Sequence, residues 1–99
     1  DWTLKYSRRA DADLIDIWAY IAADNPSAAD RHVLKLSETF EARKDFPIKG
    51  GPAPDLSEDH RILTYGSYLL IYQIDREKRV VTLIRVLHAA RDWRTLFDD

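Results

Sequence analysis

RVVTLIRVLHAARDW, residues 79–93, is the stretch around which the rest of the chain is organised. From Val80 to Leu87 it is a β-branched and aliphatic run whose only polar members are Thr82 and Arg85, which predicts a strand. Because both faces of such a strand are largely apolar, we expect it inside a sheet, with neighbouring strands beside it and a covering layer on each face. His88 follows at the end of the strand, close to Arg85. Polar residues at the end of a buried strand are often part of a functional site.

Length and composition limit what the chain can be. It has 99 residues, which we interpret as one domain over residues 1–99 with room for a core. It lacks cysteine, paired histidines at ligand spacing and a glycine-rich phosphate loop, so we expect no metal and no cofactor. No apolar run approaches the roughly 18 residues of a membrane span, and no signal-peptide core is present, so we expect a cytoplasmic protein without membrane association.

The net charge of −2 is unevenly distributed along the chain. Residues 1–59 carry a net −4, residues 60–94 a net +4, and Asp98 and Asp99 complete the chain. A basic C-terminal half suits an acidic partner, although short spans often show such an imbalance by chance. We expect no sequence-specific nucleic-acid binding by this chain alone.

The first 25 residues predict a strand followed by a helix. Apolar and polar residues alternate over Trp2–Tyr6, which indicates a strand with one buried face. Ser7 is a candidate N-cap for a helix that must end at Asp24-Asn25-Pro26, because proline disfavours a helical residue before it. Its apolar positions recur at helical spacing: Ala10, Leu14, Ile17, Trp18 and Ile21.

A second helix should start immediately, with Asn25 as N-cap and Pro26 at its first position, and run to about Asp45. Its apolar positions are Ala29, Val33, Leu36 and Phe40. Two amphipathic helices joined so tightly fold back on one another as an antiparallel hairpin.

Prolines and glycines break all periodicity over residues 46–59, which we interpret as a surface loop. Three strands follow, at His60–Tyr65, Tyr68–Asp75 and Arg79–Leu87, joined by tight turns at residues 66–67 and 76–78. The second turn has no Gly or Asn, so the register leaves open whether Tyr72 shares a face with Arg85 or with Ile84. Asp92 can cap a short last helix through Trp93, Leu96 and Phe97.

These elements predict an α+β fold. An N-terminal strand, an αα hairpin, a three-stranded antiparallel meander and a short C-terminal helix would combine, with the helices on one face of a mostly antiparallel sheet. Apolar residues on the other face would then need to be covered by the terminal helix or by a partner. The candidates for this face are Leu69, Ile71, Val81, Leu83 and Leu87, of which we expect some to lie there. The two kinds of cover are equally compatible with the sequence.

Nearly the whole chain resembles the ParE branch of the RelE/ParE toxins of bacterial toxin-antitoxin pairs. The resemblance rests on Ser7–Ala10 leading into Asp13–Ile21, on Asn25-Pro26 followed by Ala28-Ala29, on Phe46-Pro47, on Tyr68–Tyr72, and most specifically on Ile84–Asp92, IRVLHAARD. It implies a toxin that is held inactive in a hetero-oligomer with a ParD-like antitoxin. ParE toxins poison DNA gyrase so that cleaved DNA accumulates, whereas RelE toxins share the fold but cut messenger RNA on the ribosome.

Ribonuclease chemistry needs a proton acceptor for the 2′-hydroxyl, a donor for the leaving oxygen, and cations for the phosphate. Arg61, Arg85 and Arg91 could supply the cations, and His88 could transfer a proton, but no second acid or base is evident. We favour His88 as a strand-end residue whose ring bonds a backbone carbonyl. Arg85 is as compatible with an ion pair, for example to Asp92, as with a partner contact.

We therefore predict a non-enzymatic gyrase inhibitor that is neutralised by an antitoxin. The alternative is a ribosome-dependent messenger-RNA endoribonuclease. A third hypothesis is an inactive relative that only binds its partner. The candidate target-binding residues are Arg61, Arg85, His88 and Arg91. The candidate antitoxin-binding residues are Trp18, Tyr20, His32, Leu83, Leu87 and Trp93. The antitoxin would bind as a helix across the hairpin and as a strand along the sheet edge.

Overall fold

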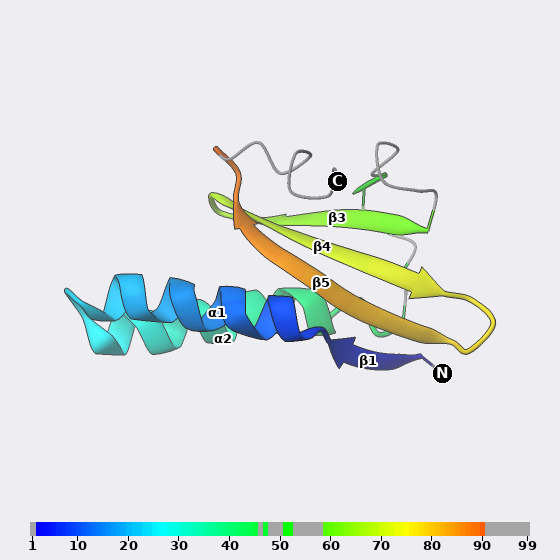
Figure 1. The fold of residues 1–99 in the computed structure, drawn as a ribbon, viewed down its shortest axis with the longest axis horizontal. Coiled ribbons are helices and arrows are strands. Elements are labelled where there is room, and N and C mark those ends of the chain that lie inside the picture. The colour runs from blue at the N-terminus through cyan, green and yellow to red at the C-terminus, as the bar shows by residue number, and fades with distance from the viewer. Residues whose placement is uncertain (1, 46, 48–50, 53–58, 91–99) are drawn as a thin grey trace.

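The computed structural model describes residues 2–45, 47, 51–52 and 59–90 (Figure 1). Its elements are β1 (Thr3–Tyr6), α1 (Arg8–Ala22), α2 (Pro26–Glu41), β2 (Gly51–Pro52), β3 (His60–Tyr65), β4 (Tyr68–Asp75) and β5 (Val80–His88). The strands form one sheet in the order β1-β5-β4-β3-β2, with β1 parallel to β5 and the other neighbours antiparallel. The predicted α+β fold is confirmed. Neither helix of the described chain has the length and apolarity that crossing a membrane requires.

Both predicted helix starts are confirmed by their capping bonds. Ser7 Oγ accepts a hydrogen bond from the Ala10 N–H at 3.0 Å, and Asn25 Oδ1 accepts one from the Ala28 N–H at 3.1 Å. Each cap satisfies a backbone donor that a helix start otherwise leaves unpaired. The two helices lie side by side as a hairpin that extends beyond the sheet (Figure 1).

The second helix ends four residues before the predicted boundary, at Glu41 rather than near Asp45. After it the chain tightens, because the Arg43 N–H bonds the Phe40 carbonyl and the Lys44 N–H bonds that of Glu41. Bonds of this i to i−3 kind are typical of a helix that unwinds through a last narrow turn.

The main core lies between the hairpin and one face of the sheet. Its fully buried members include Leu36 and Phe40 from α2, with Leu14 of α1 only 9% exposed. Strand residues complete this cluster: Leu63, Leu70, Tyr72, Ile74, Val81, Leu83 and Val86. The prediction that Val81 and Leu83 lie on the opposite face is therefore wrong.

The opposite face carries a second, smaller cluster. Ile71 and Leu87 are buried there, and Ile62, Leu69 and Ile84 pack against them. Ile71, Leu69 and Leu87 thus lie on the face that the sequence predicted for them. The residues predicted to form a terminal helix, which was one of the two possible covers beside a partner, lie outside the described residues.

A β-bulge explains the division between the two faces. Ile71 lies opposite Arg85 but Tyr72 lies opposite Leu83, so Ile84 is an extra residue in β5. Tyr72 therefore packs with Leu83 in the main core, and neither Arg85 nor Ile84 belongs to that cluster. Both alternatives for the face of Tyr72 assumed an uninterrupted register, which the bulge removes.

The predicted loop over residues 46–59 contains one short strand. Gly51 lies opposite Ile62 and Pro52 opposite Arg61, so β2 extends the sheet beyond β3. Proline is tolerated in such an outer strand because its missing N–H can face away from the ladder. The rest of that segment, apart from Pro47 and Asp59, lies outside the described residues.

Candidate functional site

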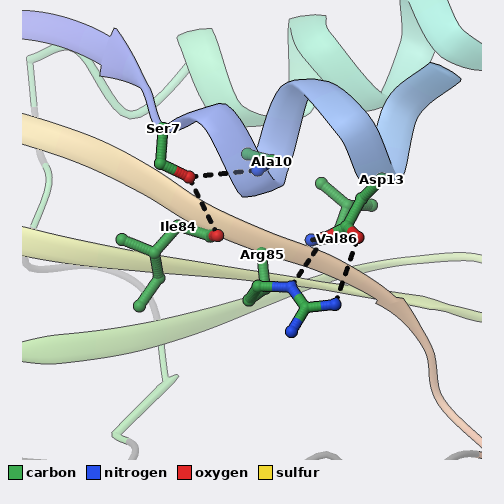
Figure 2. A network of polar contacts seen from close by, with 6 residues as sticks. All are labelled: Ser7, Ala10, Asp13, Ile84, Arg85 and Val86. Atoms are coloured by element: carbon green, nitrogen blue, oxygen red, sulfur yellow. Dashed lines mark hydrogen bonds and ion pairs between the residues drawn. The ribbon is translucent and has the colours of Figure 1, made fainter. Parts of the chain in front are cut away.

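The edge of β5 changes partner along its length. β1 pairs with Val80–Leu83 only, and the Ser7 N–H, just after β1, bonds the Leu83 carbonyl at 2.9 Å. Beyond that point, side chains at the start of α1 replace the strand (Figure 2). Ser7 Oγ donates to the Ile84 carbonyl at 3.0 Å, and Asp13 Oδ2 accepts from the Val86 N–H at 2.9 Å. This stretch of edge is therefore already hydrogen-bonded and closed to strand addition.

Asp13 also holds the charged residue of β5. The Arg85 Nε donates to Asp13 Oδ2 at 2.8 Å and Arg85 Nη2 donates to Oδ1 at 3.1 Å (Figure 2). The two side chains are only 8% and 12% exposed. Such a two-pronged pair is geometrically specific and fixes both partners. The sequence left open whether Arg85 forms an ion pair or contacts a partner, and the structure shows an ion pair. Its carboxylate partner is Asp13. Asp92, the example given from the sequence, lies outside the described residues.

His88 is exposed at the end of β5. Its ring forms a hydrogen bond with the backbone, as expected, but with an N–H group rather than a carbonyl. Its Nδ1 accepts a hydrogen bond from the Ala90 N–H at 3.2 Å, where a carbonyl partner was expected. In this contact Nδ1 acts as an acceptor, so the ring is tied to the backbone just after the strand. The ring also packs edge-on against Tyr68, with 5.4 Å between the ring centroids.

A groove of about 510 Å³ lies between α1 and the end of β5. Its α1 wall is formed by residues at helical spacing, so that they share one face. The lining residues are Asp13, Asp16, Ile17 and Tyr20 from α1, Tyr68 from β4, and Val86, Leu87 and His88 from β5. We call this the α1–β5 groove.

Aromatic rings support the far wall of the groove. The His32 ring of α2 packs edge-on against Tyr65 and Tyr68, with centroid distances of 5.8 and 5.1 Å. Tyr68 in turn contacts His88. These contacts connect the hairpin to the end of β5, so the groove is built on packed elements.

The candidate antitoxin-binding residues do not share one surface. Trp18 donates its indole N–H to Asp30 of α2 at 2.7 Å, whereas Tyr20 is 82% exposed and lines the α1–β5 groove. His32 packs toward the sheet, and its Nε2 is buried without a hydrogen-bond partner in the described chain.

The strand candidates for antitoxin contact are mostly inaccessible. Leu83 is fully buried in the main core, so its side chain is not available to a partner and the prediction is wrong for this residue. Leu87 is 3% exposed, although it contributes to the groove lining. Trp93 lies outside the described residues.

The candidate target-binding residues are also dispersed. Arg61 lies opposite Tyr72 and His88 lies opposite Tyr68, which places them four residue positions, or about 13 Å, apart along the sheet. The Arg61 guanidinium donates to the neighbouring His60 carbonyl at 2.9 Å. Arg91 lies outside the described residues, and neither Arg61 nor Arg85 lines the groove that contains His88.

The sequence missed Asp13, Asp16 and Tyr68 as groove residues. Carboxylates such as Asp13 and Asp16 are common in the first turns of a helix, where the helix dipole favours them, and Tyr68 was predicted only as a strand residue. The available signal was the spacing of Asp13, Asp16, Ile17 and Tyr20, which places both carboxylates beside apolar neighbours on one helix face. In the part of the chain that the structure describes, no three His, Asp or Glu side chains are placed to hold a metal ion.

Comparison with known proteins places this fold in a family. Residues 4–93 match the model of the "ParE toxin of type II toxin-antitoxin system, parDE". Toxin ParE1 of Caulobacter vibrioides is 35% identical over 92 residues, which cover 91% of this chain and 92% of that protein.

Two solved structures are similar in fold. The chromosomal ParDE toxin-antitoxin system of P. aeruginosa matches with a TM-score of 0.73 and 21% identity, over 88% of this chain and 95% of that one. The toxin-antitoxin complex RelBE2 of Mycobacterium tuberculosis matches with a TM-score of 0.68 and 25% identity, over 91% and 93%. Because residues 4–93 match the family model and toxin ParE1 is 35% identical over most of both chains, the chain belongs to the ParE toxin family of type II toxin-antitoxin systems.

Proposed function

We propose that this toxin inhibits DNA gyrase by stabilising cleaved DNA, and that a cognate ParD-like antitoxin neutralises it by direct binding. The family match and the similarity to toxin ParE1 support the ParE type of activity over the RelE type. A small toxin of this kind acts by occupying a surface of its target, so the proposal requires no catalytic group.

The surroundings of His88 are the observation that carries this choice. A ribonuclease places its acid or base beside cations that receive the phosphate charge. Here His88 shares the α1–β5 groove with the carboxylates of Asp13 and Asp16, and no lysine or arginine is among the described lining residues. Arg85, the nearest arginine in sequence within the described chain, is bound by Asp13. The charge that the described lining brings to the His88 ring is therefore negative, which disfavours the binding of a polyanion there.

Arg85 no longer serves as a proposed target contact, because its guanidinium is buried and paired. Arg61 and His88 remain proposed gyrase contacts, together with Arg91. Since Arg61 and His88 lie apart, this proposal needs a gyrase surface that spans the sheet rather than a single pocket.

Cleavage of supercoiled plasmid by purified gyrase tests the function. Plasmid, gyrase, ATP and toxin are incubated, denatured with detergent and digested with protease, and linear DNA is quantified. We expect linear DNA to accumulate with toxin and to fall to background when the toxin is first mixed with its antitoxin. A toxin of confirmed fold that binds its antitoxin yet yields no linear DNA would count against gyrase as the target.

We also propose how the antitoxin binds. Large apolar side chains are exposed on both helices of the hairpin: Ile15 (66%), Trp18 (41%), Tyr20 (82%) and Leu34 (57%). An amphipathic antitoxin helix could cover part of this surface. A strand could not add along β5 from Val80 to Val86, because β1, Ser7 and Asp13 already bond that edge.

Hydrogen exchange of the toxin with and without antitoxin tests this binding mode. We expect new protection in the exposed turns of α1 and α2, and little change for β5 amides that are already bonded. Unchanged exchange throughout the hairpin would contradict the proposed helix site.

A further inference from the structure

The α1–β5 groove is unlike the exposed hairpin surface, because it combines an unpaired carboxylate with aromatic and apolar walls. We propose that it receives the side chain of an arginine or lysine from the antitoxin. The inference rests on the proposed antitoxin partnership and adds the chemistry of one contact to it.

The charges of the lining favour a cation. The carboxylate of Asp13 is balanced by the Arg85 guanidinium. Asp16 is exposed and has no ion pair or hydrogen bond within the described chain. The ring of His88 accepts a hydrogen bond at Nδ1 from the Ala90 N–H. Among the described residues that line the groove, one negative charge, that of Asp16, is therefore left uncompensated.

The remaining lining suits the rest of a long basic side chain. The half-buried Ile17 offers apolar surface for the methylene stem, and Tyr20 and Tyr68 add aromatic rings to the same lining. Lysine and arginine bury an apolar stem while keeping the charged end near water or an aromatic face. An acidic side chain would be repelled by Asp16, and an apolar one would desolvate the carboxylate without compensation.

The groove is also held in shape before any partner arrives. Asp13 is fixed by two bonds from Arg85 and one from the Val86 N–H. Tyr68 lies between the His32 and His88 rings. Because a preformed site has less to order on binding, one well-placed basic side chain can contribute measurably to affinity.

Calorimetry with the full-length antitoxin encoded beside this toxin tests the inference. The dissociation constant is measured at low and moderate salt for wild-type toxin, Asp16→Asn, Asp16→Glu and the control Asp24→Asn, whose carboxylate is exposed near the end of α1 and outside the groove lining. We expect Asp16→Asn to weaken binding about tenfold at low salt and to reduce its salt dependence, since a charge-assisted bond is lost. Asp16→Glu should retain most of the affinity and Asp24→Asn should match wild type.

The possible failures are distinguishable. If Asp16→Asn binds with wild-type affinity, or loses affinity with an unchanged salt dependence, the groove does not receive a cation and the inference is wrong, while the antitoxin partnership stands. If wild-type toxin does not bind the antitoxin at all, the proposed partnership fails instead. Matching losses in Asp16→Asn and Asp24→Asn would also overturn the inference, because they would reflect overall charge.

Discussion

Asp13 and Arg85 lie 72 positions apart in the sequence, yet they form a two-pronged ion pair that fastens the first turns of α1 to β5 (Figure 2). The same carboxylate accepts the Val86 N–H, so one side chain satisfies both a buried cation and a strand edge. This contact joins α1 to the end of β5, and Asp13 also lines the α1–β5 groove.

Loss of the Asp13 carboxylate should therefore destabilise the fold. Asp13→Ala leaves the Arg85 charge buried without a partner and the Val86 N–H without an acceptor, which should lower the free energy of unfolding by about 3–5 kcal/mol. Asp13→Asn keeps an acceptor for Val86 and should cost less. Urea denaturation measures both, with Asp16→Asn as the exposed carboxylate control. An unchanged midpoint for Asp13→Ala would show that the pair does not hold α1.

The core beneath the hairpin gives a second prediction. Leu14→Ala and Phe40→Ala should each cost about 2–5 kcal/mol, because they leave a cavity between the helices and the sheet. Ile15→Ala and Leu34→Ala, on the exposed side, should stay within about 0.5 kcal/mol. Chemical denaturation separates the two pairs. Wild-type midpoints for Leu14→Ala and Phe40→Ala would mean that the core lies elsewhere, and lost toxicity in these two variants would report unfolding.

A buried hydroxyl gives a third prediction. The Tyr72 hydroxyl donates to the Pro47 carbonyl, and the Tyr72 side chain is fully buried beside Phe40. Tyr72→Phe preserves the packing but removes the donor, which should lower the free energy of unfolding by about 1–3 kcal/mol. Tyr20→Phe, at an exposed position, is the matched control. Equal stability of Tyr72→Phe and wild type would show that the bond contributes nothing net.

Protonation of His60 should reduce stability below neutral pH. Burial lowers the pKa of His60, with a smaller opposing effect of Asp59. In the unfolded chain a histidine titrates near 6.5, so as the pH falls through about 6.5 the unfolded state binds the proton more readily and folding stability decreases. His60→Gln should remove this part of the pH dependence. Proton NMR of the ring tests it directly, and a His60 midpoint at or above 6.5 would contradict the prediction.

Local signals explain what the sequence could predict. Ser7 and Asn25 act on backbone groups three residues away, and helical spacing places Leu36 and Phe40 on one face, so both helices could be read from neighbouring residues. The strands followed in the same way from their apolar runs and turns.

Contacts between distant segments explain what could not be predicted. The bulge at Ile84 arises from how β4 and β5 meet, and no residue type announces it. The role of Asp13 depends on where the edge of β5 loses its strand neighbour. The sequence around Asp13 indicates only the start of a helix. The α1–β5 groove and the ion pair between Asp13 and Arg85 therefore became visible only in the folded structure.

The measurement that tests the central claim most directly compares wild-type toxin and His88→Gln in two assays, DNA cleavage by gyrase and messenger-RNA cleavage on ribosomes, using variants of confirmed stability. We predict cleaved DNA with both proteins and no transcript cleavage with either, because His88 transfers no proton. Removing a catalytic acid or base typically costs about 10²- to 10⁴-fold in rate. Transcript cleavage by wild type that disappears in His88→Gln, without cleaved DNA, would contradict the account and establish the ribonuclease.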